Sequence, residues 1–167
     1  LVFALLLSVI LVYMVLASQY ESLLHPFTIL LTIPFGLVGA VMIFLITGTP
    51  LNIMGVMGII MLAGIAINNS ILLVGRINQL KATMDLTEAI VQAGQQRIRP
   101  IIMTSLTTIL VLLPMTFSFG EGAAMRSSMA IAVIGGLVTS TLMSLVVIPC
   151  VYYVFEQMKW RVTKRKG

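Results

Sequence analysis

Five long apolar runs dominate this chain and restrict what it can fold into. Each is close to the roughly 20 residues that an α-helix needs to cross a bilayer, and together they cover residues 1–18, 27–47, 51–75, 100–119 and 128–155. Of the 167 residues, 59% are hydrophobic and only 9% are charged, whereas a soluble domain has about 25% charged residues. The sequence therefore predicts an all-α integral membrane protein, a bundle of five transmembrane helices.

The basic residues sort to one side of this predicted topology. Nine of the ten Lys and Arg residues fall in the 76–99 connection or in the tail 156–167, and the tenth is Arg126. Because cytoplasmic loops carry an excess of Lys and Arg, we expect residue 1 outside and the tail in the cytoplasm. The net charge of +5 then reflects topology rather than nucleic acid binding, since no basic patch is interleaved with aromatic residues. The start at Leu1, inside an apolar run, is typical of a fragment.

The 76–99 connection predicts a helix of its own. Asp85 followed by Glu88 resembles a capping box, apolar residues then recur at helical spacing, and Gly94 is suited to the position after a helix end. We expect a short cytoplasmic amphipathic helix here. The next span would then begin at Pro100, where a missing N–H does no harm.

Small residues recur at intervals of four in two of the spans. Gly36 and Ala40 lie in the second span, and Gly136, Ser140 and Ser144 lie in the fifth. This spacing lets membrane helices approach closely. We therefore expect these two spans to belong to packed helices rather than to independent anchors.

Polar and aromatic residues near the ends of the spans have simple interpretations. Aromatic rings at the inner end of the last span are typical of interface anchors; these are Tyr152, Tyr153 and Trp160. Titratable residues in the turns and at the span ends are expected to be solvated; these are Glu21, His25, Glu121 and Glu156.

The third span contains an adjacent pair of asparagines, Asn68 and Asn69, followed by Ser70. An unpartnered amide in hydrocarbon costs on the order of several kcal/mol. Successive residues are about 100° apart around a helix, so at least one of the three must face a neighbouring helix or a hydrated cavity. Interhelical hydrogen bonding and a hydrated polar centre both explain the pair, and the residues alone leave both interpretations open.

The fourth span has a polar stripe. Arg97, Thr104 and Thr108 lie close to one helical face, with Thr107 beside them and Ser105 nearby. Each threonine can bond back to the carbonyl four residues earlier, and Arg97 can be an interface anchor. Four hydroxyl residues in five positions also suit a polar path along the helix. We group Ser70, Thr107 and Thr108 as candidate lining of such a path.

Other chemistry is missing from the spans. Their interiors contain no Asp, Glu, His or Lys, so no group here can carry a proton across the bilayer centre by itself. No nucleophile is paired with a base, and no cluster has metal-ligand spacing, so the sequence indicates neither an enzyme nor a cofactor or metal site. Met54, Met57 and Met61 follow helical spacing, and we expect them to pack in the core.

Four stretches of the sequence match a known pattern in order and spacing. They read "ASQYESLLHPFTILLTIPFGLVGA", "GIIMLAGIAINNSILLVGRINQL", "RIRPIIMTSLTTILVLLPM" and "GGLVTSTLMSLVVIPCVYYV". The chain closely resembles the C-terminal membrane segment of resistance-nodulation-division (RND) efflux transporters, the multidrug exporters of bacterial inner membranes. The resemblance implies that residues 1–167 are the last five of twelve spans. It also implies a proton-driven exporter that forms homotrimers and, in Gram-negative cells, works with a periplasmic adaptor and an outer-membrane channel.

The resemblance also implies roles for four residues. Asn68 matches a position that faces a pair of aspartates in the N-terminal half of the transporter, where the well-studied multidrug members have lysine. Asn69 matches a common family asparagine, Thr104 a relay threonine, and Arg97 the first arginine of the "RxRP" motif. Because an amide cannot compensate carboxylate charge as an ammonium does, either the proton chemistry differs or another cation, such as Arg97, takes part.

Other members of the superfamily offer alternative functions. The "NN" pair is unlike the pattern usual in heavy-metal exporters, so organic or amphiphilic substrates are the preferred interpretation. Export of metal, lipid or protein on the same scaffold, and a purely structural helical bundle, remain as alternatives.

Overall fold

The computed structural model describes residues 2–117 and 119–164; predictions that involve Leu1, Ser118 or residues 165–167 lie outside the described residues. In this part of the chain every regular element is an α-helix. In order they are α1 (Val2–Tyr20), α2 (Leu24–Leu30), α3 (Thr32–Thr47), α4 (Ile53–Lys81), α5 (Leu86–Thr116) and α6 (Ala123–Lys164). Five stretches are long and apolar enough to span a membrane, with α2 and α3 forming one of them. The predicted all-α membrane bundle is confirmed.

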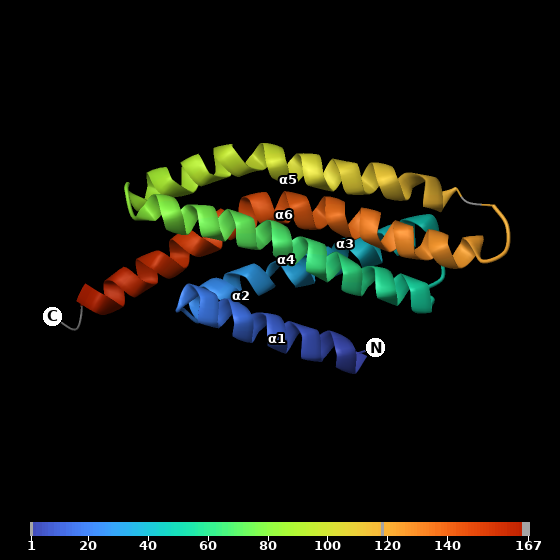
Figure 1. Cartoon of the computed structure of the whole chain (residues 1–167), viewed down its shortest axis with the longest axis horizontal. Coiled ribbons are helices and arrows are strands. Elements are labelled where there is room, and N and C mark those ends of the chain that lie inside the picture. The colour runs from blue at the N-terminus through green and yellow to red at the C-terminus, as the bar shows by residue number, and fades with distance from the viewer. Residues whose placement is uncertain (1, 118, 165–167) are drawn as a thin grey trace.

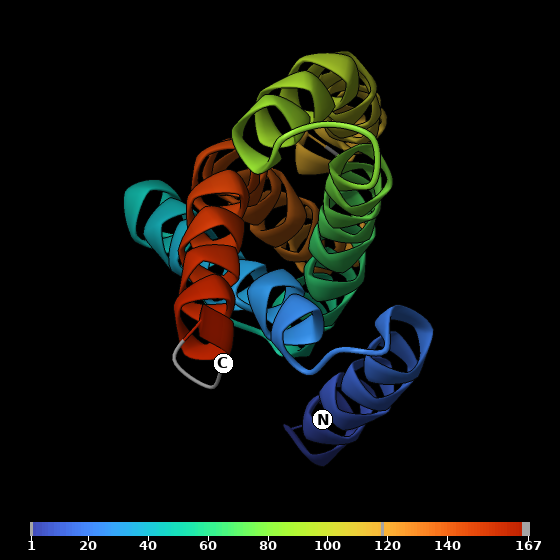
Figure 2. The same ribbon diagram turned by 90° about the vertical axis from the view of Figure 1, so that its left-hand side faces the viewer.

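The helices are arranged around α6 (Figures 1 and 2). α4, α5 and α6 run along the long axis of the molecule, and α6 makes its most extensive contacts with α3 and α4, then with α5. α1 lies to one side and is attached mainly through α2. Only Leu16 of α1 is buried. One end of the bundle carries the α1–α2 turn, the α4–α5 turn and the C-terminal part of α6; we call it the basic end.

The small residues predicted to pack do so between α3 and α6. Gly36 lies against Ser140, because a Cβ built at Gly36 is 3.5 Å from the Ser140 Cβ. At Gly136 the approach is closer, since a Cβ there would lie 2.9 Å from the Gly36 carbonyl oxygen. Ala40 is fully buried in the same seam. Backbone therefore contacts backbone where these helices cross, as small residues permit.

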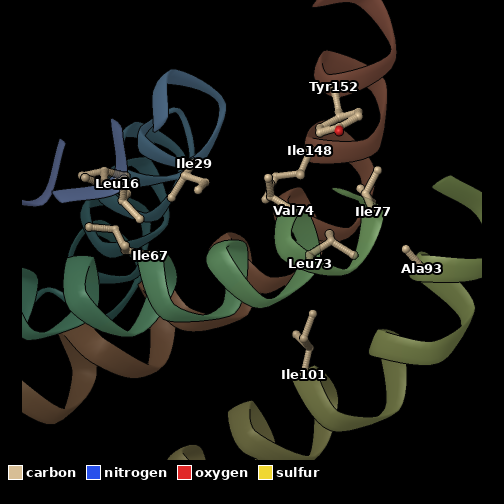
Figure 3. Close-up of a cluster of buried hydrophobic side chains, with 11 residues drawn as sticks. Leu16, Ile29, Ile67, Leu73, Val74, Ile77, Ala93, Ile101, Ile148 and Tyr152 are labelled. Atoms are coloured by element: carbon tan, nitrogen blue, oxygen red, sulfur yellow. The ribbon is translucent and has the colours of Figure 1, made fainter. Parts of the chain in front are cut away.

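A second region of close packing surrounds the basic half of α4 (Figure 3). Leu73, Val74 and Ile77 of α4 are fully buried, and they pack against Ile148 and Tyr152 of α6. Ile29 of α2, Ile101 of α5 and other side chains complete this cluster. The cluster thus includes at least one buried side chain from each of the six helices.

The second span is broken at Leu31 into α2 and α3. Pro34 has no N–H to donate to the Leu30 carbonyl, which removes one bond of the helical ladder. The Thr32 hydroxyl donates to the Ile29 carbonyl at 2.7 Å, and the Leu31 N–H still donates to Phe27 at 3.1 Å. Local hydrogen bonds therefore pair some of the backbone groups at the break. Sequence periodicity alone did not predict this break.

The predicted separate amphipathic helix is wrong in one respect. Its residues are helical, but they form the first turns of α5, which continues through both Gly94 and Pro100. Asp85 is the N-cap residue, yet its side chain makes no capping hydrogen bond. Pro100 is therefore an interior proline rather than a first-turn one. Ala89 and Ala93 on this segment are fully buried, so packing against the bundle holds the segment in line with the rest of α5.

Substitution of Gly136 by alanine is expected to destabilise the bundle by about 1–3 kcal/mol, the usual cost of overpacking. The new methyl group would press on the Gly36 carbonyl oxygen and on the Leu62 side chain. The matched control is Gly64→Ala in α4, because a Cβ there meets nothing within 4 Å. Thermal unfolding of the full-length protein in detergent measures the difference. Equal midpoints for the two variants would contradict this account of the α3–α6 contact.

Candidate functional site

An open groove runs between α4 and α5 on the outside of the bundle. It has a volume of about 480 Å³, and α4 contributes Met61 while α5 contributes the remaining lining residues Met103, Thr104, Thr107, Thr108, Val111 and Leu112. Thr104 and Thr107 are exposed, and Thr108 is half-buried. Three hydroxyl groups thus line an otherwise apolar surface at membrane depth, and we call this surface the α4/α5 groove.

Asn68 lies on the same side of α4 as Met61. Seven residues separate them, which is close to two helical turns or about 10 Å along the axis. Asn68 is exposed, as are Met57 and Leu72 on the same stripe. The exposed stripe of α4 therefore carries one polar side chain where it continues from the groove toward the basic end.

The contact between Arg76 and Gln96 sets the register of α4 against α5. The Arg76 Nε donates to the Gln96 Oε1 at 2.7 Å, and the two helices are joined by a tight turn and run antiparallel. Asn68 lies eight residues from Arg76, and Thr104 lies eight residues from Gln96. Equal steps of about 1.5 Å per residue place Asn68 and Thr104 at the same depth. Two of the residues singled out from the sequence thus lie level with one another on neighbouring helices.

The threonine hydroxyls bond back to their own helix, as one of the two sequence interpretations held. Thr104 donates to the Pro100 carbonyl at 2.9 Å, Thr107 to Met103 at 2.7 Å and Thr108 to Thr104 at 2.9 Å. These bonds use the hydroxyl protons only. A hydroxyl oxygen keeps its capacity to accept, so the groove presents hydrogen-bond acceptors to whatever occupies it.

The remaining polar residues of this group face inward. Asn69 is 3% exposed, and its side chain makes no hydrogen bond within the described part of the chain. Ser70 is fully buried, and its hydroxyl contacts the Thr32 hydroxyl at 3.2 Å and donates to Ala66 at 2.8 Å. Ser105 pairs with Thr141 of α6 at 2.8 Å. Ser70 and Ser105 therefore line no groove; they join helices inside the bundle.

Arg97 is half-buried on α5, about 10 Å below Thr104 toward the basic end. No ion pair involves it within the described residues. The prediction that the methionines pack in the core is wrong for Met57 and Met61, which are 47% and 46% exposed. They lie on the open stripe of α4 because its buried face is already filled by Leu62 and by small residues that contact α6.

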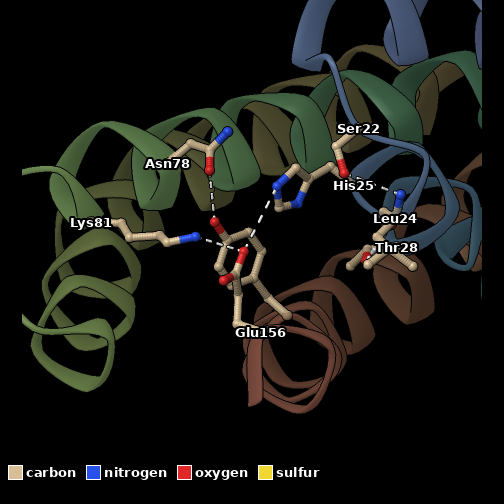
Figure 4. A network of polar contacts seen from close by, with 8 residues as sticks. Ser22, Leu24, His25, Thr28, Asn78, Lys81 and Glu156 are labelled. Carbon is tan, nitrogen blue, oxygen red and sulfur yellow. Dashed lines mark hydrogen bonds and ion pairs between the residues drawn. The ribbon is translucent and has the colours of Figure 1, made fainter. Parts of the chain in front are cut away.

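A polar network at the basic end joins α2, α4 and α6 (Figure 4). The Lys81 Nζ lies 2.7 Å from the Glu156 Oε1, and the His25 Nε2 lies 4.0 Å from the same oxygen. The Tyr152 hydroxyl donates to the Asn78 Oδ1 at 2.7 Å. The His25 ring stacks on Tyr152 with centroids 5.0 Å apart. Charges and rings from three helices thus meet in one place.

This network corrects three sequence predictions. His25 and Glu156 are not solvated, since their side chains are only 11% and 12% exposed. Tyr152 is not an interface anchor, because it is buried at 1% exposure, whereas Tyr153 is exposed. The spacing of Tyr152 and Glu156 at i and i+4 places both on one face of α6. That spacing was the only sign in the sequence that the two side chains act together. The fold was needed to show that this face of α6 packs against α2 and α4.

Metal-binding clusters of His, Cys, Asp or Glu are absent from the described residues. The groove and the polar network therefore consist of hydroxyl, amide, ammonium and carboxylate groups with aromatic support. Such groups can accept, donate and relay protons when a titratable partner is brought to them. The groove itself has none, so its chemistry depends on an occupant.

Comparison with known proteins decides the family. Residues 1–156 match the model of the AcrB/AcrD/AcrF family. The chain belongs to this family. It is 37% identical over 158 residues to the multidrug resistance protein MdtC of Edwardsiella ictaluri (strain 93-146), covering 93% of this chain and 15% of that protein. It is also 37% identical over 161 residues to MdtC of Proteus mirabilis (strain HI4320), covering 95% and 16%.

Two solved structures share this fold. A crystal structure of a heavy metal efflux pump, crystal form II, superposes with a TM-score of 0.85 at 29% identity, covering 93% of this chain and 16% of that chain. Crystal form I gives a TM-score of 0.78 at 29% identity, covering 90% and 15%. The chain thus spans about one sixth of the length of its relatives. Its family and its five apolar helices make it a multi-pass membrane segment.

Replacement of Glu156 by glutamine is expected to destabilise the basic end by about 1.5–3 kcal/mol, the range for a hydrogen bond to a charged group. The loss should fall short of that for a fully buried pair, because Lys81 is 35% exposed and can turn to water. Glu88→Gln is the matched control, since Glu88 is exposed and has no ion pair among the described residues. Thermal unfolding of the full-length protein measures both, and an unchanged midpoint for Glu156→Gln would disprove a stabilising role.

Proposed function

We propose that this chain is the C-terminal membrane half-domain of a proton-driven exporter of drugs or other amphiphilic compounds. One observation carries the proposal: Asn68 and Thr104 lie at the same depth on an open surface of α4 and α5, and this surface exposes polar groups within an apolar span. Such a surface is unfavourable in lipid. It suits a protein partner with polar or titratable residues at that depth, and the N-terminal half of the same transporter supplies one.

The proposed relay uses the aspartate pair of that N-terminal half. Asn68 donates its amide hydrogens to an aspartate, and the Thr104 oxygen accepts from the protonated form, since the Thr104 proton is already donated to Pro100. Asn69, which is buried beside Asn68, holds the relay segment of α4 in place from inside the bundle. Arg97, nearer the basic end, supplies the positive charge that the well-studied multidrug members obtain from a lysine at the position of Asn68. Thr107 and Thr108 extend the polar lining along α5.

The proposal also includes an orientation and an assembly. The basic end faces the cytoplasm of a bacterial cell, as the positive-inside rule requires, and residue 1 lies outside the inner membrane. The transporter is a homotrimer that works with a periplasmic adaptor and an outer-membrane channel in Gram-negative cells. The segment moves its substrate without covalent chemistry, so it is not an enzyme, and it needs no cofactor.

A second candidate is the export of soft metal ions. The structural likeness to a heavy metal efflux pump and the exposed thioethers of Met57 and Met61 favour it, because soft sulfur ligands select soft metals. The multidrug relatives are more similar in sequence, at 37% against 29% identity, so organic substrates are preferred. Replacement of Met61 by leucine separates the two, because it should impair the export of copper(I) only if the methionines carry metal.

Transport by the full-length protein tests the relay. In proteoliposomes with an imposed pH gradient, Asn68→Ala, Asn69→Ala and Thr104→Ala should each lower proton-driven export of a fluorescent amphiphile by about a hundredfold or more, the lower end of the range for a lost general acid–base partner. Each should leave binding of that amphiphile unchanged without a gradient. The reason is that the substitutions remove relay groups and not substrate contacts.

Ser105→Ala is the matched control for Thr104→Ala. Its hydroxyl lies one residue away but pairs with Thr141 inside the bundle, so its loss should affect stability and not coupling. Unchanged export in all three relay variants would reject the relay and favour a structural bundle. Export of lipid or protein without export of the amphiphile would favour the function of other members of the superfamily.

A further inference from the structure

A second concave site lies at the basic end, away from the α4/α5 groove. It is a hollow of about 530 Å³ between the α4–α5 turn and the last turns of α6, and its lining includes Lys81, Asp85, Tyr153, Trp160 and Arg161. This volume is within the range of small-molecule sites. Neither the relay nor the polar network explains why these residues surround an open space. We call this site the basic-end hollow.

The charges of the basic-end hollow fall into two groups. Lys81 and Glu156 satisfy one another at 2.7 Å. Asp85 and Arg161 also line the hollow, yet neither forms an ion pair with the other or with any described residue, and Asp85 makes no capping bond. The hollow therefore offers one exposed carboxylate and one exposed guanidinium, neither of which has an ion-pair partner among the described residues.

An apolar track leads from the hollow toward the middle of the membrane. Tyr153, Cys150 and Val146 are exposed and lie at helical spacing on one side of α6. Trp160, at 63% exposure, marks the polar end of the same side. A tryptophan ring in this position is typical of the membrane interface. The hollow and the track together have the shape of an amphiphile with a charged head and an apolar chain.

We propose that the basic-end hollow binds a zwitterionic phospholipid whose headgroup carries a phosphate and a primary ammonium. Arg161 binds the phosphate, because a guanidinium matches two of its oxygens at once. Asp85 accepts hydrogen bonds from the ammonium, and an acyl chain lies along Val146, Cys150 and Tyr153. Asp85 disfavours a purely anionic headgroup by like-charge repulsion. A quaternary ammonium lacks the N–H donors that Asp85 would accept from.

Native mass spectrometry of the full-length transporter tests the proposal. The protein, delipidated in detergent, is titrated with phosphatidylethanolamine, phosphatidylcholine or phosphatidylglycerol of matched acyl chains. Phosphatidylethanolamine should bind most tightly. Asp85→Asn should reduce its advantage over phosphatidylcholine to nearly nothing, and Arg161→Gln should weaken both lipids by about tenfold, as for the loss of one charge-assisted hydrogen bond. No proton gradient is involved, so the result is independent of the proposed transport.

Two controls separate this site from general attraction to the basic tail. Lys159→Gln removes a neighbouring cation that does not line the hollow, and Glu88→Gln removes an acidic group in the first turn of α5. Both should leave the preference unchanged. Tighter binding of phosphatidylglycerol, or equal effects of Arg161→Gln and Lys159→Gln, would overturn the proposal. Equally tight binding of acyl-free glycerophosphoethanolamine would overturn the assignment to a lipid. All four residues are exposed or outside the packed core, so the variants should fold.

Discussion

The close contact of α3 with α6 is the constraint on which the rest of the bundle depends. Water provides no hydrophobic drive between helices in lipid, so shape and dispersion must hold them together. Gly36 and Gly136 let the two backbones approach until a carbonyl oxygen fills the space of a missing methyl group. With α3 fixed on α6, α4 covers the remaining side of both helices, and α5 packs on α4 and α6. This arrangement leaves one face of α4 and α5 without a helix of this segment packed against it.

Polar groups are divided between the inside and the outside of this frame. Ser70, Thr32, Ser105 and Thr141 pair with one another across helices and are buried. Asn68 and Thr104 stay outside and level with each other. Two adjacent amides thus serve two surfaces, because a step of about 100° around α4 is enough to carry Asn69 into the bundle. The open surface of this segment is the interface that we propose for the N-terminal half of the transporter.

Much of the fold follows from the sequence alone, because span length, charge asymmetry and small-residue spacing are local properties. The helical content, the close packing at the small residues of α3 and α6, and the different directions of Asn68 and Asn69 were predictable for this reason, although the sequence did not show that α3 and α6 pack against each other. The break at Leu31, the continuity of α5 through Pro100 and the burial of His25, Tyr152 and Glu156 were not. The continuity of α5 and the burial of these side chains depend on which neighbour a helix face meets, whereas Pro34 removes one helical bond near Leu31 but does not by itself decide whether the helix bends or breaks. The candidate relay residues came from family resemblance, and the structure adds the common depth and the exposure of two of them, Asn68 and Thr104.

The length of α6 has a mechanical consequence. Its 42 residues extend for about 63 Å, roughly twice the hydrocarbon thickness. Gly136 is clamped against α3, whereas Arg161 lies 25 residues further on, at a distance of about 37 Å. A tilt of about 5° around the clamp displaces that far end by about 3 Å, if Pro149 does not absorb it by bending. α6 can therefore act as a lever that turns a slight adjustment in the middle of the bilayer into a movement at its surface.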